Sequence, residues 1–417
     1  MYISTLQLEN FRNYRRLDLH VGPSINVFFG ANAQGKTNLI EAVYLCACAR
    51  SHRTSKDREL IFHGESFYKI NLKLRSRKRQ RDVLAEENQY EETLSLSFQD
   101  AKETPAGFIK AKRTAEHDDV PFEKISDFIG IFHAVIFAPE DLLLIKEGPS
   151  VRRRYLDLLI SQVRPMYFFD LQTYAKILMQ KNKTLKLLRQ KKGIRQLSEE
   201  EKKEIEIWDF PLAQVASRII AERIKFSERV RFFASEKHLQ ISGGKESLFV
   251  RYRTVTGILS EEVLADPHNH LAEMEEILFN KWKVTVQDDF EKGSTSSGPH
   301  RDDLELSLDG DGLRAFASQG QQRSAALALK LAELMILREE TGESPVLLLD
   351  DVFSELDSSR RACLLQNIED SQVFLSCTDR SFIEKELLDT CEKDPVCSVA
   401  GRQISFFEVL DGSVTER

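Results

Sequence analysis

The chain has 417 residues, with 59 Lys and Arg against 66 Asp and Glu, and a net charge of −7. This length exceeds what one small core needs and indicates two domains, or one large domain with an insertion. Hydrophobic residues make up 41% and charged residues 30%, which is typical of a globular rather than a disordered chain. Gly (19) and Pro (11) are scarce, which disfavours collagen-like and low-complexity classes. The acidic total argues against a uniformly basic surface but does not exclude local basic patches, where DNA or RNA could bind.

Composition also bears on redox state and location. The six cysteines form no CxxC pair, so neither a zinc site nor a thioredoxin-like motif is indicated, and reduced cytosolic thiols are expected. Residues 1–6 lack the basic region and apolar core of a signal peptide. No apolar run reaches the roughly 18 residues that cross a membrane. We therefore expect a cytoplasmic protein.

The N-terminal third is predicted to consist mainly of strands, because apolar and polar residues alternate or form short apolar runs. Strands are predicted at residues 3–11, 17–21, 25–29, 68–74 and 93–98. Residues 38–45 have helical character. The polar tract at 75–92, between two of these strands, is interpreted as a solvated hairpin loop.

From about residue 151 to residue 239, Gly and Pro nearly vanish and apolar residues recur at helical spacing. This stretch is therefore predicted to be helical. Ser198 followed by three glutamates is typical of a capped helix start, and Gly193 is expected to end the preceding helix. Because the heptads are not sustained, no long coiled coil is expected. Beyond it we predict a strand at 246–257, a helix at 260–282, a polar loop at 293–299, further alternating strands, a helix at about 319–341 and a buried strand at 346–350.

The strongest local motif is Gly30-Ala31-Asn32-Ala33-Gln34-Gly35-Lys36-Thr37, which matches the phosphate-loop pattern at every required position. Its glycines let backbone N–H groups and the following helix N-terminus cradle phosphates. Lys36 is expected to reach the β- and γ-phosphates, and the Thr37 hydroxyl to ligate magnesium. The alternative is a chance Gly/Lys loop, which the flanking strand and helix disfavour. ATP and Mg²⁺ are thus the predicted ligands.

A second motif is the apolar strand at 346–350, which ends in Asp350 and Asp351. In a phosphate-loop protein such a strand is expected beside the loop strand. Asp350 could then hold magnesium through water, and Asp351 could orient or deprotonate the attacking water. The alternative is a core strand followed by a solvated acidic turn. The candidate catalytic residues are Lys36, Asp350 and Asp351, and the candidate metal ligands are Thr37 and Asp350.

A third motif, Ser318-Gln319-Gly320-Gln321, stands at the start of the helix predicted at 319–341. A Ser/Gly turn at a helix N-terminus is a second anion-binding site. More than three hundred residues separate the phosphate loop from the acids, which is unlike simple nucleotide kinases and GTPases. Two phosphate half-sites in one chain suggest a nucleotide held between two protomers. The alternative is a capped helix of no catalytic interest.

Residues 318–321 resemble the signature motif of ABC-type ATPases, and residues 354–357 resemble their D-loop. Four further segments, 8–14, 30–37, 137–142 and 297–304, precede these two motifs. All of them occur in the same order as the motifs of the bacterial RecF family of recombination mediators, which they resemble. The resemblance implies an α/β fold: an ABC-type ATPase head with a mixed sheet, related to the SMC family, and a helical second lobe. The implied segments are 1–145 and 285–417 for the ATPase lobe, and 146–284 for the helical lobe.

The resemblance also implies an activity. The chain would form a homodimer with ATP, bind DNA, hydrolyse ATP weakly with stimulation by DNA, and act with RecO and RecR in DNA repair, replication restart and SOS induction. Lys36 and Thr37 of one protomer and Ser318 of the other would enclose each ATP. By position, Arg12 and Asn13 would lie near the nucleotide. A transporter ATPase subunit and a small-molecule kinase are the other function classes; the first is disfavoured because neither a membrane-docking surface nor a switch histidine is evident, and the second by the signature motif.

Some positions depart from the wider ABC pattern. Glu140 and Asp141 stand where a glutamine loop is usual, and residues 378–379 stand where many members have a switch histidine. Asp351 replaces the usual glutamate, and its shorter reach predicts slow turnover. His300 and Arg301 suggest a catalytic role. The alternative is a structural turn in which Arg301 pairs with Asp302 or Asp303.

DNA contacts are expected from clusters of cations, which can neutralise phosphates without reading sequence. For each cluster the alternative is a solvated face. The candidates are Lys73, Arg75, Arg77, Lys78, Arg79 and Arg81, then Lys110, Lys112 and Arg113, then Arg152, Arg153 and Arg154, and finally the run at 181–192.

Overall fold

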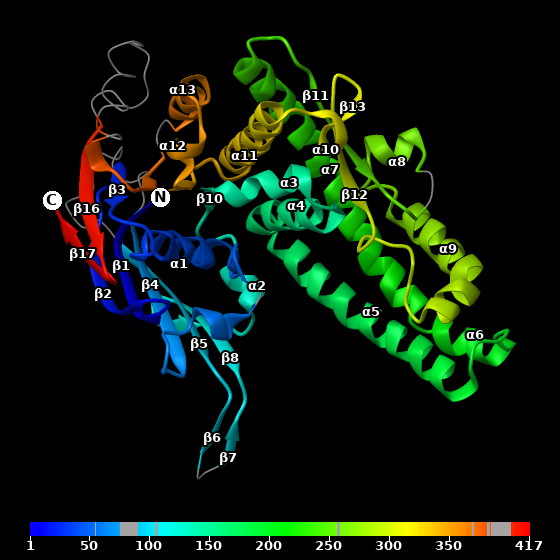
Figure 1. The fold of residues 1–417 in the computed structure, drawn as a ribbon. Helices are drawn as coiled ribbons and strands as arrows, with labels where there is room; N and C mark the ends of the chain where they lie inside the picture. The colour runs from blue at the N-terminus through cyan, green and yellow to red at the C-terminus, as the bar shows by residue number, and fades with distance from the viewer. Residues whose placement is uncertain are drawn as a thin grey trace, which may run out of the picture. The chain divides into compact units, whose positions relative to one another are not determined.

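The structure is a computed structural model that describes residues 1–54, 56–75, 91–104, 107–256, 259–368, 371–381, 384 and 402–417 (Figure 1). By its contacts the chain divides into two units. Unit 1 comprises Met1–Leu142, Gln240–Gly244 and Ala326–Arg417, and unit 2 comprises Leu143–Leu239 and Lys245–Ala325. The fold is α/β, and each unit has its own sheets and helices.

The observed division differs in part from the expected segments. The first expected boundary, at 145/146, lies close to the observed one at 142/143. The second, at 284/285, does not coincide, because residues 285–325 make their contacts within unit 2. The strand at Asp303–Leu308 pairs there with the strand at Leu248–Arg253. The signature-like residues 318–321 therefore belong by contact to unit 2.

Unit 1 contains an antiparallel sheet with the order β2-β1-β4-β5-β8-β9. Its strands are β1 (Tyr2–Phe11), β2 (Tyr14–His20), β4 (Phe67–Arg75), β5 (Glu91–Gln99), β8 (Lys112–His117) and β9 (Val120–Pro121). β4 buries alternate residues, as the sequence pattern predicted. A separate hairpin joins β6 (Lys102–Thr104) to β7 (Gly107–Ile109). β4 and β5 pair as the expected hairpin, and the interior of the polar tract, 76–90, lies outside the described residues.

The second sheet of unit 1 carries the phosphate loop and has the order β10-β14-β15-β3-β16-β17. Its strands are β3 (Ile25–Phe29), β10 (Ala134–Phe137), β14 (Val346–Asp350), β15 (Val373–Cys377), β16 (Ile404–Leu410) and β17 (Ser413–Glu416). All pairs except β16–β17 are parallel. The expectation that the 346–350 strand lies beside the loop strand is wrong: β15 lies between β14 and β3.

The helices of unit 1 pack on these sheets. They include α1 (Lys36–Cys48), α2 (Ile125–Phe128), α12 (Val352–Glu355) and α13 (Ser358–Asn367), the short 3₁₀ turns Asp57–Leu60 and Pro139–Leu142, and most of α11 (Gln319–Thr341). α1 contacts strands of both sheets and buries every residue except Thr37 and Asn38. A helix that is apolar nearly all round is typical of a core position. The two residues left accessible lie in its first turn, next to the phosphate loop.

Unit 2 is mainly helical, as the sequence predicted. Its helices are α3 (Leu143–Lys146), α4 (Pro149–Val163), α5 (Pro165–Lys192), α6 (Glu199–Glu206), α7 (Asp209–Ser242, of which residues 240–242 belong by contact to unit 1), α8 (Glu261–Ala265), α9 (Leu271–Lys292) and α10 (Leu313–Phe316). A small antiparallel sheet has the order β11 (Leu248–Arg253), β12 (Asp303–Leu308) and β13 (Asp311–Gly312). Ser198 and Glu201 form the capping box at the start of α6, and Gly193 ends α5.

The prediction of one uninterrupted helix at 260–282 in unit 2 is wrong. The segment predicted as a single helix at 260–282 forms two helices, α8 and α9, and the second continues to Lys292. The break falls at Asp266, which precedes Pro267 and has an extended φ of −140°. Proline disfavours helical geometry in the residue before it, and it lacks an N–H to continue the ladder.

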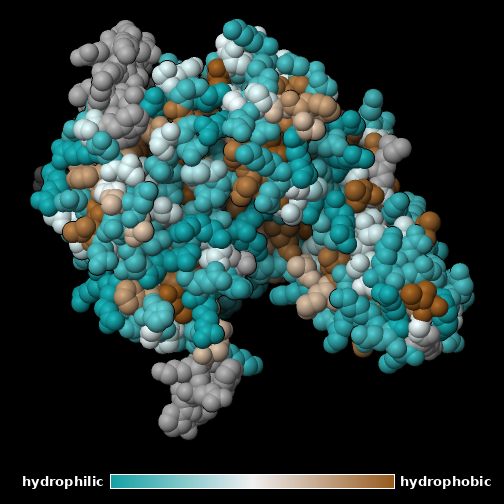
Figure 2. Space-filling view, in the orientation of Figure 1, coloured by the Kyte–Doolittle hydropathy of each residue, from teal (hydrophilic) through white to brown (hydrophobic). Residues whose placement is uncertain are grey.

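The surface shown in Figure 2 is mostly hydrophilic, with apolar side chains scattered over it. Among the described residues, no helix combines the length and the apolarity that crossing a bilayer requires.

Candidate functional site

The phosphate loop runs from the end of β3 to the start of α1 and depends on two glycines. Gly30 has a φ of 149°, and a Cβ there would lie 2.4 Å from the Val409 carbonyl oxygen. Gly35 has a φ of 114°, and a Cβ there would lie 2.5 Å from Nδ2 of Asn13. Both positions therefore require glycine for backbone conformation and for space. The pattern recognised in the sequence thus has a local steric cause.

Lys36 is folded back into the loop. Its Nζ donates hydrogen bonds to the carbonyl oxygens of Gly30 (2.6 Å) and Ala31 (2.8 Å), and the residue is only 8% exposed. Burial lowers the pKa of Lys36, while the charges of Asp351 and Asp350 act in the opposite direction. The ammonium group is thus held by carbonyl groups of the loop that would surround the phosphates. A phosphate is a stronger partner for an ammonium group than a neutral carbonyl.

The remaining loop residues are fixed from two sides. The hydroxyl of Tyr14 donates to the Gly35 carbonyl (3.1 Å), and Gln34 accepts a bond at Oε1 from the backbone N–H of Asp411 (2.7 Å). Ala31, Asn32 and Ala33, which form the tip of the loop, are exposed. The base of the loop is thus tied to β2 and to the β16–β17 turn, while its tip remains accessible to a ligand.

Thr37 and Asp350, the two predicted metal ligands, are brought together from positions 313 residues apart. The Thr37 hydroxyl donates to Oδ1 of Asp350 at 2.9 Å, and the Ser376 hydroxyl donates to the same oxygen at 2.7 Å. Burial raises the pKa of Asp350, and the two hydrogen bonds oppose that shift. Hydroxyl and carboxylate oxygens are the donors that Mg²⁺ prefers, so this pair fits a magnesium site.

Ser376 was missed by sequence reasoning. It lies on β15, the strand inserted between β3 and β14, and pairs in register with Asp350. Its Oγ also accepts a bond from the Asp351 backbone N–H at 2.9 Å. One serine therefore positions both acids. The only available signal was the apolar run at 373–375, which does not specify a neighbour of the acids.

Asp351 follows β14 directly and has a φ of 50°, in the left-handed region that favours Gly, Asn and Asp. Its carbonyl oxygen accepts a bond from the Ser354 hydroxyl at 2.7 Å. Both acids thus lie at the carboxyl end of a parallel strand, the edge where ligands bind in such sheets.

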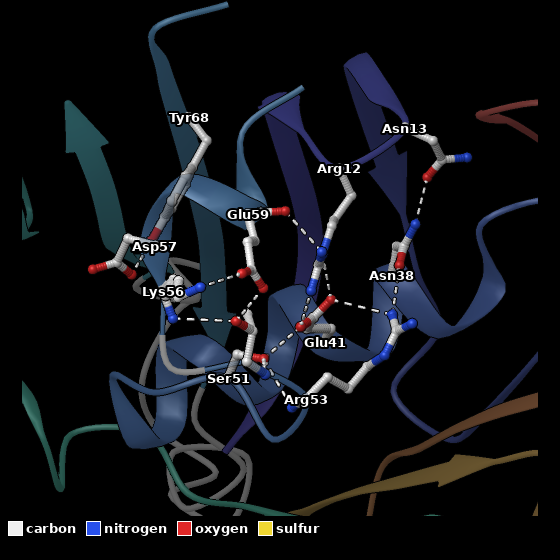
Figure 3. A network of polar contacts seen from close by, with 11 residues as sticks. Arg12, Asn13, Asn38, Glu41, Ser51, Arg53, Lys56, Asp57, Glu59 and Tyr68 are labelled. Carbon is white, nitrogen blue, oxygen red and sulfur yellow. Dashed lines mark hydrogen bonds and ion pairs between the residues drawn. The ribbon is translucent and has the colours of Figure 1, made fainter. Parts of the chain in front are cut away.

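Arg12 and Asn13, predicted to lie near the nucleotide, are held in a polar network on α1 (Figure 3). Arg12 donates twice to Glu41, at 2.8 Å each, and once to the Glu59 carbonyl at 2.7 Å. Asn13 donates to the Gln34 carbonyl at 3.0 Å. Asn13 therefore touches the phosphate loop directly, whereas Arg12 joins β1 to the helix that follows the loop.

Glu41 is the buried centre of this network, with no exposed surface. It also accepts a bond from Ser51 at 2.5 Å and lies 3.5 Å from the Arg53 guanidinium. Burial would raise the pKa of Glu41, but the hydrogen bonds from Arg12 and Ser51 hold it below the usual value. The carboxylate is thus charged, and it is shared by Arg12, Ser51 and Arg53. Glu41 and Ser51 carried no recognisable signal in the sequence.

The signature-like segment lies in unit 2 at the start of α11. Ser318 and Gln321 form a reciprocal capping box: Ser318 Oγ accepts from the Gln321 N–H (3.3 Å), and Gln321 Oε1 accepts from the Ser318 N–H (2.8 Å). Ser318 and Gln319 are exposed, and Gly320 is half-buried. The sequence predicted this helix start and its serine correctly.

Two further residues support this segment and were missed. Nε2 of Gln321 donates to Oε1 of Glu246 at 3.0 Å, and Oε2 of Glu246 lies 3.1 Å from Nε2 of His238. His238 is fully buried, and burial lowers its pKa. The signature-like residues are therefore linked to α7 by one carboxylate. Nothing in the local sequence around 246 indicates this link.

His300 and Arg301, considered as catalytic candidates, belong to a structural turn. His300 Nδ1 lies 2.7 Å from the Tyr174 hydroxyl, Nε2 lies 3.1 Å from the Thr295 carbonyl, and burial lowers the pKa to about 4. The proposed pairing of Arg301 with neighbouring acids is wrong. Asp302 accepts from Tyr252 and from the Val255 N–H, and Asp303 accepts from Arg152.

The positions that depart from the ABC pattern have local partners. Oδ2 of Asp141 accepts from the Ala138 N–H at 2.8 Å, and burial raises the pKa of Asp141 to about 6. Glu140, beside it, is exposed. Asp379 accepts two bonds from Ser381, each at 2.8 Å.

The candidate DNA-binding clusters contain several structural cations. Lys181 is 1% exposed, pairs with Asp209 at 2.6 Å and lies over the Trp282 ring. Arg113 pairs with Asp57, and Arg152 with Asp303. The cations that remain exposed are Lys110, Lys112, Lys183, Lys186, Arg189 and Lys191. Lys73 and Arg75 both pair with Glu91, and Arg77, Lys78, Arg79 and Arg81 lie outside the described residues.

The comparisons with known proteins agree with this geometry. Residues 2–391 match the family model described as the RecF/RecN/SMC N terminal domain. The chain is 39% identical over 385 residues to a DNA replication and repair protein RecF from Acetivibrio thermocellus, covering 92% of this chain and 95% of that protein. It is 35% identical over 416 residues to the protein of the same name from Clostridium novyi, covering 100% of both.

Two solved structures of the recombination mediator protein RecF, described as belonging to the RecFOR pathway, are also similar. One holds ATPrS and the other ATP. Each has a TM-score of 0.81 and 33% identity, and the match covers 100% of this chain and 98% or 97% of theirs.

Proposed function

This chain belongs to the RecF family, and from that premise we propose that it is an ATP-dependent DNA-binding recombination mediator in DNA repair and replication. The observation that carries the proposal is the bond between Thr37 and Asp350 at 2.9 Å, which joins the phosphate loop to the acidic strand end. Without that closure, the two motifs would be separate local features. The relatives are named as DNA replication and repair proteins, which is the cellular context proposed for this chain. A role in replication restart and SOS induction and a cytoplasmic location are further parts of this proposal.

ATP binding follows from the loop. The exposed tip at 31–33 and the N-terminus of α1 offer N–H groups to the phosphates. Lys36 would exchange its two carbonyl partners for phosphate oxygens, a charge-assisted contact. Thr37 and Asp350 would hold Mg²⁺, which supplies neutralisation of phosphate charge in this class of site. Asn13 would fix the loop against the bound nucleotide through Gln34.

Dimerisation follows from the third motif. Ser318 is exposed and carries a hydroxyl at the N-terminus of a 23-residue helix. We expect it to contact the ATP held by the partner subunit, so that each nucleotide is enclosed by Lys36 and Thr37 of one protomer and by Ser318 of the partner subunit. Gln319, Gly320 and Gln321 would contribute the adjoining helix N-terminus.

Hydrolysis would end the bound state. Asp351 would orient the attacking water or accept a proton from it. Its short side chain, on a backbone fixed by Ser376 and Ser354, supports slow hydrolysis. Stimulation of the ATPase by DNA is proposed from family membership alone. ATP thus drives a cycle of DNA binding and release. RecR and RecO are the proposed protein partners, by family membership and by the pathway named for the related structures.

The test is sedimentation of the full chain, with DNA-binding measurements, in the presence and absence of ATP. We expect the wild type to dimerise with ATP and to bind DNA more tightly. Lys36→Met should lower ATP affinity about 100-fold, because a charge-assisted phosphate contact is lost. Ser318→Arg should bind ATP normally but remain monomeric.

A matched control is Ser413→Arg, which places the same charge on the exposed strand β17. It should behave as the wild type. If ATP neither dimerises the wild type nor changes its DNA affinity, the proposed cycle is wrong.

A further inference from the structure

The outward face of β11 combines an aromatic ring with two arginines. Leu248 and Val250 point into the core and are 2% and 0% exposed. Phe249, Arg251 and Arg253 alternate with them on the opposite face and are exposed, Phe249 by 47%. β11 is the edge strand of its three-stranded sheet. None of these residues belongs to the cation clusters singled out in the sequence.

This face is hollowed. A cavity of about 460 Å³ is lined by Phe249, Arg251 and Arg314, among others, and a second of about 350 Å³ is lined by Arg251 and Arg253. The two cavities share Arg251 and Glu305, so they adjoin each other along the strand. Each volume falls in the range of ligand-binding pockets, about 300–1,000 Å³.

As far as the structure describes the chain, the acidic side chains that line these cavities have ion-pair partners, whereas two of the arginines do not. Asp303 is neutralised by Arg152, at 2.9 and 2.8 Å, and Glu305 by Arg253 at 2.7 Å. Within the described part of the chain, the guanidinium groups of Arg251 and Arg314 have no ion pair or hydrogen bond. Two arginines with all donors available therefore line the same cavity. A guanidinium presents a planar fork of donors that suits phosphate oxygens.

We propose that this groove, formed by Phe249, Arg251, Arg314 and Arg253, binds a short stretch of single-stranded DNA. The inference rests on the proposed DNA-binding function and assigns a site to it. Arg251 and Arg314 contact backbone phosphates. The Arg231 guanidinium lies over the Phe249 ring, 5.9 Å from its centroid, and a base stacks on the part of the ring that remains exposed. Single-stranded nucleic acids are bound by this combination of cations along a groove and aromatic faces.

The geometry favours a single strand over other anions. Outward residues two apart on a strand are separated by about 6.7 Å, so Phe249 to Arg253 spans roughly 13 Å, enough for two or three nucleotides of an extended strand. Bases in a duplex are stacked on one another, so the Phe249 ring is useful only to an unpaired base. Free phosphate has no base and therefore cannot stack on the aromatic ring of Phe249.

The experiment measures binding of a fluorescent oligothymidylate to the full chain by anisotropy, with ATP, over a series of salt concentrations. Arg251→Gln and Arg314→Gln should each weaken binding and lower the slope of log affinity against log salt by about 0.7, the value for one phosphate contact on a single strand. Phe249→Leu should weaken binding about tenfold without changing the slope, because the aromatic ring is lost. Phe249→Tyr, which keeps an aromatic ring, should bind as tightly as the wild type. Lys203→Gln, which removes an exposed cation on α6 of the same unit, should change neither the affinity nor the slope.

Three outcomes would overturn the site. The first is wild-type affinity and salt slope in all the groove variants, while the wild type itself binds DNA. The second is a loss for a duplex of equal length without a loss for the single strand. The third is that the wild type binds polyglutamate and the groove variants do not, while the same variants still bind oligothymidylate. That result would assign the groove to an acidic peptide. Failure of the wild type to bind any DNA would instead overturn the proposed function.

Discussion

The phosphate loop and the signature-like segment are both helix starts that offer anion-binding groups, yet they are built differently. The loop is closed by residues far apart in sequence: Thr37 meets Asp350, and Ser376 from a third strand fixes both acids. The signature-like segment is closed mainly by its own first turn, through the Ser318–Gln321 capping box, and Ser318 is exposed. The first is therefore a preformed cluster inside one core, which we propose as the nucleotide site. The second presents an exposed serine, which we propose contacts the nucleotide of the partner subunit.

The largest expected effect lies in the preformed site. Asp350→Asn keeps the acceptor oxygen for Thr37 and Ser376 but removes the negative charge that suits Mg²⁺. We expect single-turnover ATP hydrolysis to fall at least 100-fold, because charge stabilisation at such sites is worth about 3 kcal/mol or more. ATP binding should fall much less. Ser376→Ala, which removes one hydrogen bond and no charge, should cost about tenfold or less. Hydrolysis of Asp350→Asn within threefold of the wild type would contradict the assignment of a metal ligand.

Local chemistry explains which features the sequence predicted. Gly30 and Gly35 are required by positive φ values and by neighbouring atoms, so the loop is recognisable from a short window. The same holds for the capping residues Ser198 and Ser318, whose partners lie three positions along the chain. These features need no knowledge of topology. The helix predicted at 319–341 has the bounds of α11, and the helical segment predicted at 38–45 lies within α1 (Lys36–Cys48).

Features that depend on topology could not be read in this way. The insertion of β15 between β3 and β14 is a matter of strand order, so Ser376 was not identified and β14 was predicted in the wrong place. Lys181 has the appearance of a surface cation in sequence but is buried against Asp209 and Trp282, because its partners lie on other helices. Charge runs therefore overestimate the surface available to DNA.

We expect an effect of intermediate size on stability from Asp141, which lies in unit 1, as the phosphate loop does. Burial raises its pKa from 3.8 to about 6, so between these values the folded chain binds a proton that the unfolded chain does not. Stability from this group therefore increases as the pH falls through 6, and at pH 7.5 the ionised carboxylate costs about 3 kcal/mol. Asp141→Asn should raise the free energy of unfolding of unit 1 by about that amount at pH 7.5, and by progressively less toward pH 4, as measured by urea denaturation.

Glu140→Gln provides the matched control, since Glu140 is exposed in the same 3₁₀ turn. It should leave the pH dependence of stability as in the wild type. If Asp141→Asn raises the free energy of unfolding by the same amount at pH 4 and at pH 7.5, the charge of this carboxyl is not the cause of the increase.

The smallest effect tests how the signature-like segment is held. Glu246→Gln removes the negative charge and leaves one acceptor oxygen, which weakens the bond to Gln321 or the contact with His238. One hydrogen bond is worth about 0.5–1.5 kcal/mol, which predicts a dimer dissociation constant with ATP raised roughly 3- to 10-fold. The ATP affinity of the monomer should not change, because the phosphate loop lies in unit 1. Glu273→Gln alters a similar carboxylate–histidine pair on the exposed side of α9 and should leave both quantities unchanged. Equal effects of the two variants on dimerisation would mean that the capping box alone positions Ser318. A selective loss in Glu246→Gln would mean that this exposed helix start also depends on the buried His238, and that the contrast between the two helix starts is one of degree.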